Sequence, residues 1–344
     1  MRKQTFKGLA VGLVAVLGLA ACGSDDAATD TTAAAAEPTG LACEVTDIGG
    51  VDDKGFNQIA YAGLQQAEAE LGVAIDLLES ASDADYAPNL QSFVDKGCNV
   101  IVTVGFLLAD ATKAAAEANP GVQFAIVDSN TSAPNVQGLT FATDQPSFLA
   151  GYMAAATTQT GIVGTFGGIN IPPVAIFMQG FAKGVEYYNA QKGASVKVLG
   201  WDMAKQDGTF AGNFQNLDDG KNIAKSQADE GADIIFPVAG PVGLGSAQFA
   251  LESGGKVKII GVDVDMSVSN PDAAEVYIAS VLKNIDAAVF AAIKDVVEGS
   301  GVTDNYVGTL ANGGVGVAYT AVPADIQAEV EAIGAGIADG SIQL

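Results

Sequence analysis

From residue 41 onward, short apolar runs alternate with longer segments of helical periodicity, and this alternation constrains the fold more than any other feature. The runs CEVTDIG and NVIVTVG, for example, precede the helical patterns FNQIAYAGLQQAEAEL and LADATKAAAEA. Uninterrupted apolar runs are typical of strands buried on both faces, and their alternation with helices predicts a parallel, doubly wound sheet. A second series begins at GIVGTFGG, so we predict an α/β protein with two Rossmann-like lobes.

The composition excludes several classes of function. The chain has 344 residues, of which 49% are hydrophobic, enough for two domains with apolar cores. Its 40 acidic and 16 basic side chains give a net charge of −24, which repels phosphate backbones, so we expect no nucleic-acid partner. The absence of histidine excludes Ser-His-Asp and HExxH chemistry, and three cysteines without CxxC spacing argue against structural zinc. We therefore expect neither a metal nor a cofactor.

Residues 1–22 have the pattern of an export signal. Arg2, Lys3 and Lys7 precede the uncharged run 8–21, which is shorter than the roughly 20 apolar residues of a membrane span but typical of a secretory signal. The run ends in LAAC, which resembles a bacterial lipobox and makes Cys22 the predicted site of lipidation by diacylglycerol and palmitate. An ordinary signal peptide with an incidental cysteine is the alternative.

Residues 23–40 form a low-complexity segment, GSDDAATDTTAAAAEPTG, without a large apolar side chain. Such a segment cannot bury enough surface to offset its chain entropy, so we predict a disordered tether. A lipid on Cys22 would then hold the folded body at the extracytoplasmic face of the cell membrane.

Cys43 and Cys98 each lie near the start of a predicted strand, in CEVTDIG and CNVIVTVG. Export would place both in an oxidising compartment, and a disulfide is geometrically possible if the two strands are neighbours. Two unpaired thiols within the core are the alternative, and the residues themselves do not decide between these arrangements.

Residues directly after the predicted strands are the first candidates for a binding site. In open parallel sheets, ligands bind at the carboxyl ends of the strands. Five residues occupy such positions, namely Asp47, Gly105, Asp128, Gly240 and Asp263. Two lobes whose strand ends face each other would form a cleft that closes around a ligand. Each aspartate could instead cap the helix that follows it.

Longer motifs extend over nearly the whole body, from about residue 41 to residue 319. The most specific are TDIGGVDDKGFNQIAYAGL and the stretch GGINIPPVAIF. The complete set comprises residues 46–64, 144–155 with 161–185, 212–221 with 231–245, and 259–265 with 278–289. In these segments the chain resembles the basic membrane protein family of bacterial lipoproteins, the purine-nucleoside-binding subunits of ABC transporters.

This resemblance implies a type I periplasmic-binding-protein fold, in which a three-segment hinge joins two lobes. By analogy, lobe one comprises residues 41–144 and 268–300, and lobe two comprises residues 145–267 and 301–344. The resemblance also implies a non-enzymatic, lipid-anchored protein that captures purine nucleosides in the cleft for an ABC importer. The permease subunits of that importer would be its partners.

Two phenylalanines are candidates for stacking on the base. Phe56 follows the first strand, and Phe214 lies in the loop GTFAGNFQNLDD, where an isolated aromatic has no periodic reason to belong to a core. The resemblance places them on opposite faces of the base, where stacking contributes about 1–3 kcal/mol per base. The alternatives are a core role for Phe56 and a stacking role for Phe210 in place of Phe214. Gly105 and Phe106 would line the cleft.

The polar candidates are mainly hydrogen-bond acceptors. An ionised carboxylate can accept hydrogen bonds from two ribose hydroxyls. The resemblance implies that Asp263, Lys283 and the Gly240 backbone hold the ribose, and that the base edge and remaining polar groups meet Asp47, Asn57 and Asp128. Asp265 is an alternative to Asp263. Lys283, which we expect to open an apolar helix, could instead be solvated.

Two other functions remain open, which are binding of a sugar or another ribose-like ligand in the same fold, and hydrolysis of nucleosides by the aspartates. The absence of histidine and of recognisable metal-ligand spacing argues against the hydrolase. Because the predicted pocket is net negative, we expect it to bind nucleosides and to reject nucleotides.

Overall fold

The computed structural model describes residues 38–302 and 304–344. The expected signal segment 1–22, with the lipidation site Cys22, and residues 23–37 of the expected tether lie outside these ranges. Every helix within the described ranges is too short or too polar to span a lipid bilayer.

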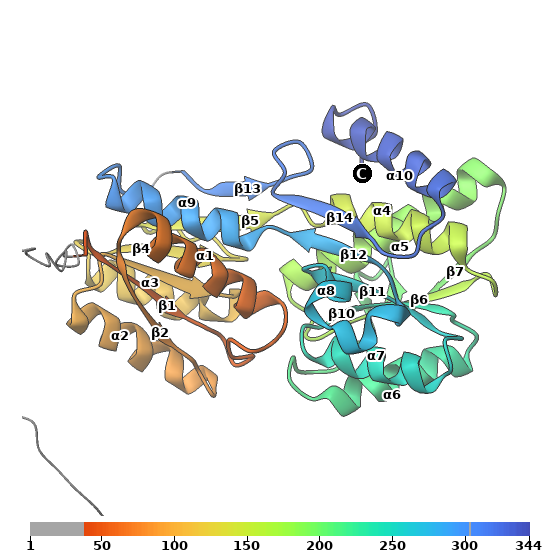
Figure 1. The fold of residues 1–344 in the computed structure, drawn as a ribbon, viewed down its shortest axis with the longest axis horizontal. Coiled ribbons are helices and arrows are strands. Elements are labelled where there is room, and N and C mark those ends of the chain that lie inside the picture. Colours follow the sequence, from red (N-terminus) through yellow and green to blue (C-terminus); the bar gives the residue numbers. More distant parts are fainter. Residues whose placement is uncertain (1–37, 303) are drawn as a thin grey trace, which may run out of the picture. The chain divides into compact units, whose positions relative to one another are not determined.

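The first of two large sheets follows the predicted pattern of parallel strands between helices (Figure 1). Its strand order is β13-β5-β4-β3-β1-β2, and every pairing is parallel. Its strands are β1 (Leu41–Val45), β2 (Ala74–Leu78), β3 (Val100–Val104), β4 (Gln123–Val127), β5 (Val136–Phe141) and β13 (Tyr306–Gly308). The helical elements around it are α1 (Phe56–Leu71), α9 (Ile285–Val297), α2 (Tyr86–Lys96), α3 (Ala109–Ala118), η1 (Asp83–Asp85) and η2 (Phe106–Leu108).

Helices on both faces explain why the central strands are apolar throughout. Val100 and Val102 of β3 pack with side chains of α1 and α9, whereas Ile101, between them, packs with side chains of α2 and α3. Successive side chains of a strand point to opposite faces, so both faces of β3 must be apolar. The continuous run NVIVTV is the direct consequence.

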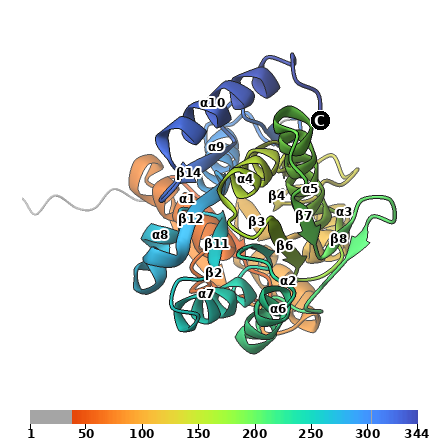
Figure 2. The same cartoon turned by 90° about the vertical axis from the view of Figure 1, so that its right-hand side faces the viewer.

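The second sheet has the strand order β14-β12-β11-β10-β6-β7, with all pairings parallel except β12 with β14. Its strands are β6 (Ile162–Gly167), β7 (Lys197–Leu199), β10 (Ile234–Val238), β11 (Lys258–Asp263), β12 (Tyr277–Lys283) and β14 (Val315–Tyr319). Figure 2 shows this sheet between two groups of helices. One group is α4 (Asp144–Thr157), α5 (Pro172–Lys192) and α10 (Ala324–Ala338), and the other is α6 (Leu217–Asp229), α7 (Val242–Glu252), α8 (Met266–Ser269) and η3 (Pro271–Val276).

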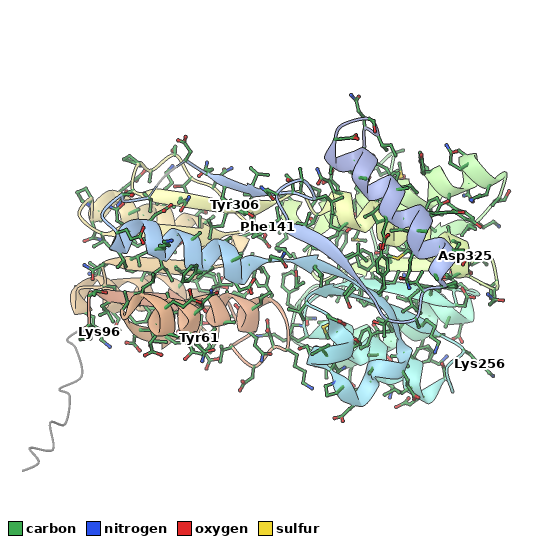
Figure 3. The ribbon with its side chains drawn as sticks, turned by 45° about the horizontal axis from the view of Figure 1, so that its top comes forward. Tyr61, Lys96, Phe141, Lys256, Tyr306 and Asp325 are labelled. Carbon is green, nitrogen blue, oxygen red and sulfur yellow. A yellow bond between two sulfur atoms is a disulfide. The ribbon has the colours of Figure 1, made fainter. Side chains whose placement is uncertain are left out.

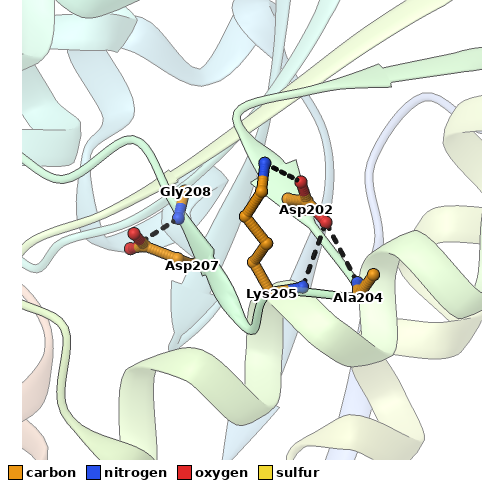
Figure 4. Close-up of polar contacts among 5 residues, drawn as sticks. All are labelled: Asp202, Ala204, Lys205, Asp207 and Gly208. Atoms are coloured by element: carbon orange, nitrogen blue, oxygen red, sulfur yellow. Dashed lines mark hydrogen bonds and ion pairs between the residues drawn. The ribbon is translucent and has the colours of Figure 1, made fainter.

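A short antiparallel hairpin follows β7 in the chain and consists of β8 (Trp201–Asp202) and β9 (Asp207–Gly208). Figure 4 shows the local contacts that hold its turn. The Asp202 carboxylate accepts hydrogen bonds from the backbone N–H groups of Ala204 at 3.0 Å and Lys205 at 3.1 Å, and Lys205 Nζ donates to it at 2.7 Å. These local contacts shape the turn, and the hydrogen bond from Trp201 Nε1 to Gln179 Oε1 at 2.9 Å attaches the hairpin to α5.

The run VKVLGWDM, which we predicted as one strand, divides at Gly200 into β7 and β8. Gly200 has a φ of 84°, a left-handed conformation that interrupts a strand and that glycine adopts without strain. A Cβ at this position would lie 1.9 Å from the carbonyl oxygen of Thr165. Close backbone approach therefore explains the break, and the apolar pattern alone did not indicate it.

Within the described residues the chain passes between the two sheets three times, after β5, after β12 and after β13. Three connections agree with the predicted three-segment hinge. We call the first sheet with α1, α2, α3 and α9 the first lobe, and the second sheet with α4 to α8 and α10 the second lobe.

Two strands, β12 and β13, do not lie in the sheets in which the expected lobe boundaries would place them. β12 belongs to the second sheet, although residues 268–300 were expected in lobe one, and β13 belongs to the first sheet, although residues 301–344 were expected in lobe two. β13 pairs with β5, and the rings of Phe141 and Tyr306 meet edge to face with centroids 5.9 Å apart. Figure 3 labels these two residues, which lie near each other. The sheet to which a strand belongs depends on pairing with strands distant in the sequence, and the apolar pattern of a strand does not indicate which strand it pairs with.

Cys43 of β1 and Cys98, just before β3, form a disulfide with their Cα atoms 6.1 Å apart. β1 and β3 are neighbours in the first sheet, which is the condition that the sequence analysis set for a bridge. Both cysteines are buried in the core between the sheet and α2. The bridge therefore ties β1 to the segment that leads into its neighbour β3, on the face away from α1.

We expect the Cys43→Ala, Cys98→Ala double variant to lose about 2–4 kcal/mol of unfolding free energy, because the bridge closes a long loop in the unfolded chain. The cysteines are separated by 55 positions. Urea denaturation of the oxidised wild type, the reduced wild type and the double variant measures this loss. Reduced wild type and variant should unfold at similar urea concentrations, and an unchanged midpoint in both would contradict the prediction.

Candidate functional site

A pocket that is partly open to solvent lies where the carboxyl ends of strands from both sheets meet. All ten predicted binding residues line it. They are Asp47, Phe56, Asn57, Gly105, Phe106, Asp128, Phe214, Gly240, Asp263 and Lys283. Small-molecule sites of α/β proteins are commonly concave and lie at such a meeting of strand ends. The positional rule for open parallel sheets therefore selected the end of both sheets at which this pocket lies.

Asp128 and Asp263 reach the pocket in the same way from the two different sheets. Asp128 directly follows β4, and Asp263 is the last residue of β11. Both have the left-handed backbone conformation, with φ values of 65° and 68°. Aspartate is one of the few residues other than glycine that adopts this conformation at modest cost. The conformation ends each strand and turns it at the pocket wall.

Asp263, and not Asp265, is the pocket residue of the GVDVD segment. Asp265 caps α8, where its carboxylate accepts hydrogen bonds from the backbone N–H of Ser267 at 3.0 Å and from the hydroxyl of Ser267 at 2.6 Å. Its side chain is committed to the helix that follows, which is the alternative role that the sequence left open for every aspartate after a strand.

Asn57 joins two buried carboxylates at one end of the pocket. Its Nδ2 group donates to Asp47 Oδ1 at 2.8 Å and to Asp53 Oδ2 at 3.2 Å. Asp47 Oδ1 also accepts from the backbone N–H of Gly49 at 2.9 Å. Asp47 therefore does not cap α1, and its position is held by two donors that converge on one of its oxygens.

Asp53 is the residue that caps α1, and the sequence analysis did not select it. Its carboxylate accepts hydrogen bonds from the backbone N–H groups of Gly55 at 2.9 Å, Asn57 at 2.8 Å and Gln58 at 3.1 Å. Burial raises the pKa of Asp53, and these hydrogen bonds oppose the shift. Asp53 lies two residues before Gly55, the N-cap residue of α1, so it does not occupy the position at which an aspartate is a recognisable capping signal.

Lys283 occupies the centre of a second polar cluster and is only 2% exposed. Its Nζ donates to Asp128 Oδ2 at 2.6 Å and lies 3.7 Å from Asp263 Oδ1. The prediction that Lys283 opens a helix is wrong, because it is the last residue of β12 and α9 begins at Ile285. The strand end directs the side chain into the protein, where a helix surface would have left it in solvent.

Three aromatic rings surround the Lys283 ammonium group. Its Nζ lies 4.6 Å from the ring centroid of Phe56, 5.5 Å from that of Phe141 and 5.6 Å from that of Phe177. Cation–π contacts of this kind compensate part of the cost of removing an ammonium group from water. Because Phe56 and Phe141 belong to the first lobe, the lysine of a second-lobe strand links the two halves of the site.

Burial raises the pKa of Asp263 to about 6, against the opposing effect of the nearby Lys283 ammonium group and with support from the negative charges of Asp128 and Asp53. Burial likewise raises the pKa of Asp47 to about 6, although the hydrogen bonds from Asn57 and Gly49 favour its charged form. At pH 7 both carboxyl groups are therefore mostly ionised, and they hold negative charge in a poorly solvated pocket.

The aromatic and aliphatic walls come from both lobes. Phe214 packs so closely on Gly168 that a Cβ there would lie 2.2 Å from its ring. Phe210, the alternative stacking residue, instead contacts Trp201 edge to face at 6.5 Å and does not line the pocket. Apolar lining residues that the sequence analysis did not select include Ile171, Pro173, Val174 and Phe177. All four belong to the IPPVAIF motif. This motif supported the family resemblance, but none of its residues was predicted to contact the ligand.

Direct hydrogen bonds join the lobes through the loop that precedes α1. Gln215 Nε2 donates to the carbonyl oxygen of Ile48 at 2.5 Å, and Ser269 Oγ donates to that of Lys54 at 2.5 Å. Lys54 Nζ lies 3.4 Å from Asn270 Oδ1. The structure therefore shows the lobes in contact around the pocket, the arrangement expected of a closed two-lobed binding protein.

Among the described residues, no group of three or more histidine, cysteine or acidic side chains is arranged to hold a metal ion. The pocket offers acceptors, one ammonium group and apolar walls. Its geometry is that of a site that encloses a small polar molecule between two hinged α/β lobes, which defines the class of solute-binding proteins.

Comparison with known proteins identifies the family. Residues 42–332 match the Bmp family, described as ABC transporter substrate-binding protein PnrA-like, and the chain belongs to this family. Substrate-binding proteins of ABC transporters bind their solute without catalysis, act outside the cytoplasm and pass the solute to permease subunits. The resemblance read from the sequence is thus confirmed at the level of the family.

Individual relatives agree with this assignment. The chain is 36% identical over 276 residues to the "ABC transporter nucleoside-binding protein BmpA" of Lactococcus lactis subsp. cremoris, covering 77% of this chain and 75% of that protein. It is 33% identical over 245 residues to "Basic membrane protein A" of Borreliella burgdorferi, covering 70% and 68%.

Solved structures confirm the fold. A solute-binding protein of an ABC transporter system from Aeropyrum pernix K1 superimposes with a TM-score of 0.78 at 27% identity, covering 88% of this chain and 92% of that chain. A second, from Conexibacter woesei, gives a TM-score of 0.67 at 22% identity, with coverages of 88% and 98%, and supports the fold alone.

The Asp263→Asn variant should unfold at higher denaturant concentration than the wild type at pH 7.5. Burial raises the pKa of Asp263 from 3.8, the ordinary value for an aspartate, to about 6 in the folded protein. Below pH 3.8 the Asp263 carboxyl group is neutral in both the folded and the unfolded state. Above about pH 6 it is ionised in both states, but only the folded state buries the charge. The contribution of this group to the free energy of unfolding therefore falls as the pH rises from 3.8 to about 6. Asparagine removes that decline and also tolerates the left-handed backbone.

We expect a stability gain of about 2–3 kcal/mol at pH 7.5, which shrinks toward zero near pH 4. Urea denaturation of wild type and variant at pH 4, 6 and 7.5 measures it, and the comparison cancels the charge effects that both proteins share. A gain independent of pH, or a loss at pH 7.5, would show that the ionised carboxylate is not a source of strain.

Proposed function

We propose that this protein captures purine nucleosides in the pocket between its lobes and delivers them to the permease of an ABC importer. The observation that carries the proposal is the convergence, in one pocket, of aromatic residues from both lobes and two separate acceptor clusters. A nucleoside has a matching set of groups, which are two aromatic faces, a hydrogen-bonding base edge and a ribose diol. The printed name of the Lactococcus lactis relative, a nucleoside-binding protein, supports the same ligand class.

In the proposed complex the base lies between Phe56 of the first lobe and Phe214 of the second. Both phenylalanines line the pocket, and Phe214 has Gly168 behind it as a flat support. Stacking would contribute about 1–3 kcal/mol per base and would tolerate several bases, because every base has a π-face. Binding would also link the lobes, since each supplies one ring.

The ribose is assigned to the cluster of Asp128, Asp263 and Lys283, together with the Gly240 backbone. Charge-assisted hydrogen bonds from the ribose hydroxyls to these carboxylates would contribute about 1.5–3 kcal/mol each. The sequence analysis grouped Asp128 with the base edge, but its contact with Lys283 at 2.6 Å supports a place beside the ribose. Asp47 and Asn57 then face the base edge.

A phosphate group has no place in this arrangement. The pocket lining contains four carboxylates, Asp47, Asp53, Asp128 and Asp263, and a single ammonium group, Lys283. A nucleotide would add negative charge where the local charge is already negative, and the low polarisability of a buried site strengthens that repulsion. The proposed ligands are therefore nucleosides, and nucleotides are excluded.

Calorimetric titration with adenosine, guanosine, inosine, cytidine, ribose and AMP tests the proposal. We expect purine nucleosides to bind most tightly, cytidine more weakly because its ring is smaller, and AMP not at all. The Phe56→Leu variant should weaken nucleoside binding by about 1–3 kcal/mol, or roughly 5- to 150-fold.

Free ribose that binds as tightly as the nucleosides would overturn the stacking role and point to a sugar-binding protein. Phe210→Leu is the matched control, because Phe210 lies in the same loop as Phe214 but outside the pocket. Its affinity for nucleosides should equal that of the wild type.

We also propose that Cys22 carries a lipid that holds the protein at the extracytoplasmic face of the membrane. The support is the sequence LAAC at the end of an apolar run. In cells grown with labelled palmitate, the wild type should carry the label and sediment with membranes, whereas Cys22→Ser should do neither. Thr31→Ala, a change in the proposed tether, should behave as the wild type, and an unlabelled wild type would refute the anchor.

A further inference from the structure

The two polar clusters of the pocket differ in what they can offer a ligand. The cluster around Lys283 contains a cation, whereas the cluster of Asp47 and Asn57 presents only acceptor atoms. Asp47 Oδ1 is already occupied by the N–H groups of Gly49 and Asn57. Asp47 Oδ2 accepts no hydrogen bond from the described residues and lies 3.2 Å from the position of a Cβ on Gly105, at the pocket wall.

The amide of Asn57 has a single chemically acceptable orientation. Its Nδ2 group donates to carboxylate oxygens of both Asp47 and Asp53, so both amide hydrogens are used. Turning the amide over would set its carbonyl oxygen against two carboxylates. In the orientation observed, Asn57 Oδ1 is buried and has no hydrogen-bond partner among the described residues. A buried acceptor without a partner is uncommon and costly, and in a binding pocket it points to a donor on the ligand.

We infer that the Asp47 and Asn57 acceptors select nucleosides whose base edge presents N–H donors, that is, 6-oxopurine nucleosides such as guanosine and inosine, over adenosine. The inference rests on the proposed function and assigns selectivity within it. Guanine offers donors at N1 and at its 2-amino group, side by side, and hypoxanthine offers the N1 donor. Adenine offers its 6-amino group beside N1, which is an acceptor and would face the Asp47 carboxylate.

The inferred selectivity should also depend on the protonation state of Asp47. Burial raises the pKa of Asp47 to about 6, with contributions from the charges of Asp53 and Asp128, and the buried phenol of Tyr86 also interacts with it. Above this pKa the group is an acceptor only, and below it the carboxyl group presents a donor as well. The protonated form matches the donor and acceptor of adenine, so the preference for guanosine should shrink as the pH falls from 7.5 to 5.

Titration of the wild-type protein with guanosine, inosine, adenosine and 1-methylguanosine tests the inference without any substitution. At pH 7.5 guanosine should bind about 10- to 100-fold more tightly than adenosine, with inosine between them. Methylation at N1 removes one donor but keeps the ring and the ribose, so 1-methylguanosine should lose a similar factor. Equal affinity for guanosine and adenosine would overturn the inference but leave the proposed function intact, whereas no binding of any nucleoside would overturn the proposed function itself.

The Asp47→Asn variant replaces the pocket-facing acceptor, Asp47 Oδ2, with a hydrogen-bond donor. Asparagine can keep an oxygen toward Gly49 and Asn57 and replaces the pocket-facing oxygen with an amide NH₂ group. We expect its guanosine-to-adenosine preference to fall at least about tenfold and to lose its dependence on pH. Asp263→Asn is the matched control, because it removes a charge from the other cluster and should weaken both nucleosides by a common factor.

Thermal melting of each variant establishes that it is folded before titration. An Asp47→Asn protein that is folded and keeps the wild-type ratio of affinities would overturn the assignment of Asp47, as would a change of that ratio in Asp263→Asn instead. If Asp47→Asn does not fold, the 1-methylguanosine comparison in the wild type decides the question alone.

Discussion

The buried ammonium group of Lys283 is the interaction on which the rest of the site depends. Its contact with Asp128 at 2.6 Å joins a strand end of the second lobe to one of the first, and Asp263 lies 3.7 Å away. Without it, several carboxylates would share a poorly solvated pocket with no opposite charge, and their mutual repulsion would favour separation of the lobes. Three aromatic rings around the ammonium group add cation–π contacts to the stabilisation that the two carboxylates provide.

The pocket is built from groups that are costly in the absence of a ligand. The pKa values of Asp47 and Asp263, raised to about 6 chiefly by burial, show that solvent does not fully stabilise their charges. Asn57 Oδ1 likewise lacks a partner among the described residues. Strain of this kind at a binding site is common, because a ligand that supplies the missing donors recovers the cost as affinity. The disulfide and the two apolar cores stabilise the lobes on which this site depends.

Much of the site could be predicted because strand ends can be recognised locally. A buried parallel strand is mostly apolar, so a polar residue or glycine within two positions of its end marks the carboxyl edge of the sheet, as Asp47, Asp128 and Gly240 do. The apolar wall around Phe177 was missed, because an aromatic residue in a helix next to proline has the same local pattern whether it packs in a core or lines a pocket. Asp53 was also missed, because it precedes the N-cap position by two residues and only the folded loop brings its carboxylate to the start of α1.

The sequence by itself determined the alternation of strands and helices, the family, and the candidate residues at the strand ends, since each of these follows from local pattern and motif. The tertiary structure alone decided which sheet holds β12 and β13, that Lys283 ends a strand and turns inward, and that Asp263 and Phe214 reach the pocket while Asp265 and Phe210 do not. The physical reason is that these outcomes depend on partners distant in the chain. A residue's neighbours in sequence specify its conformation far better than they specify what lies across a sheet or a cleft from it.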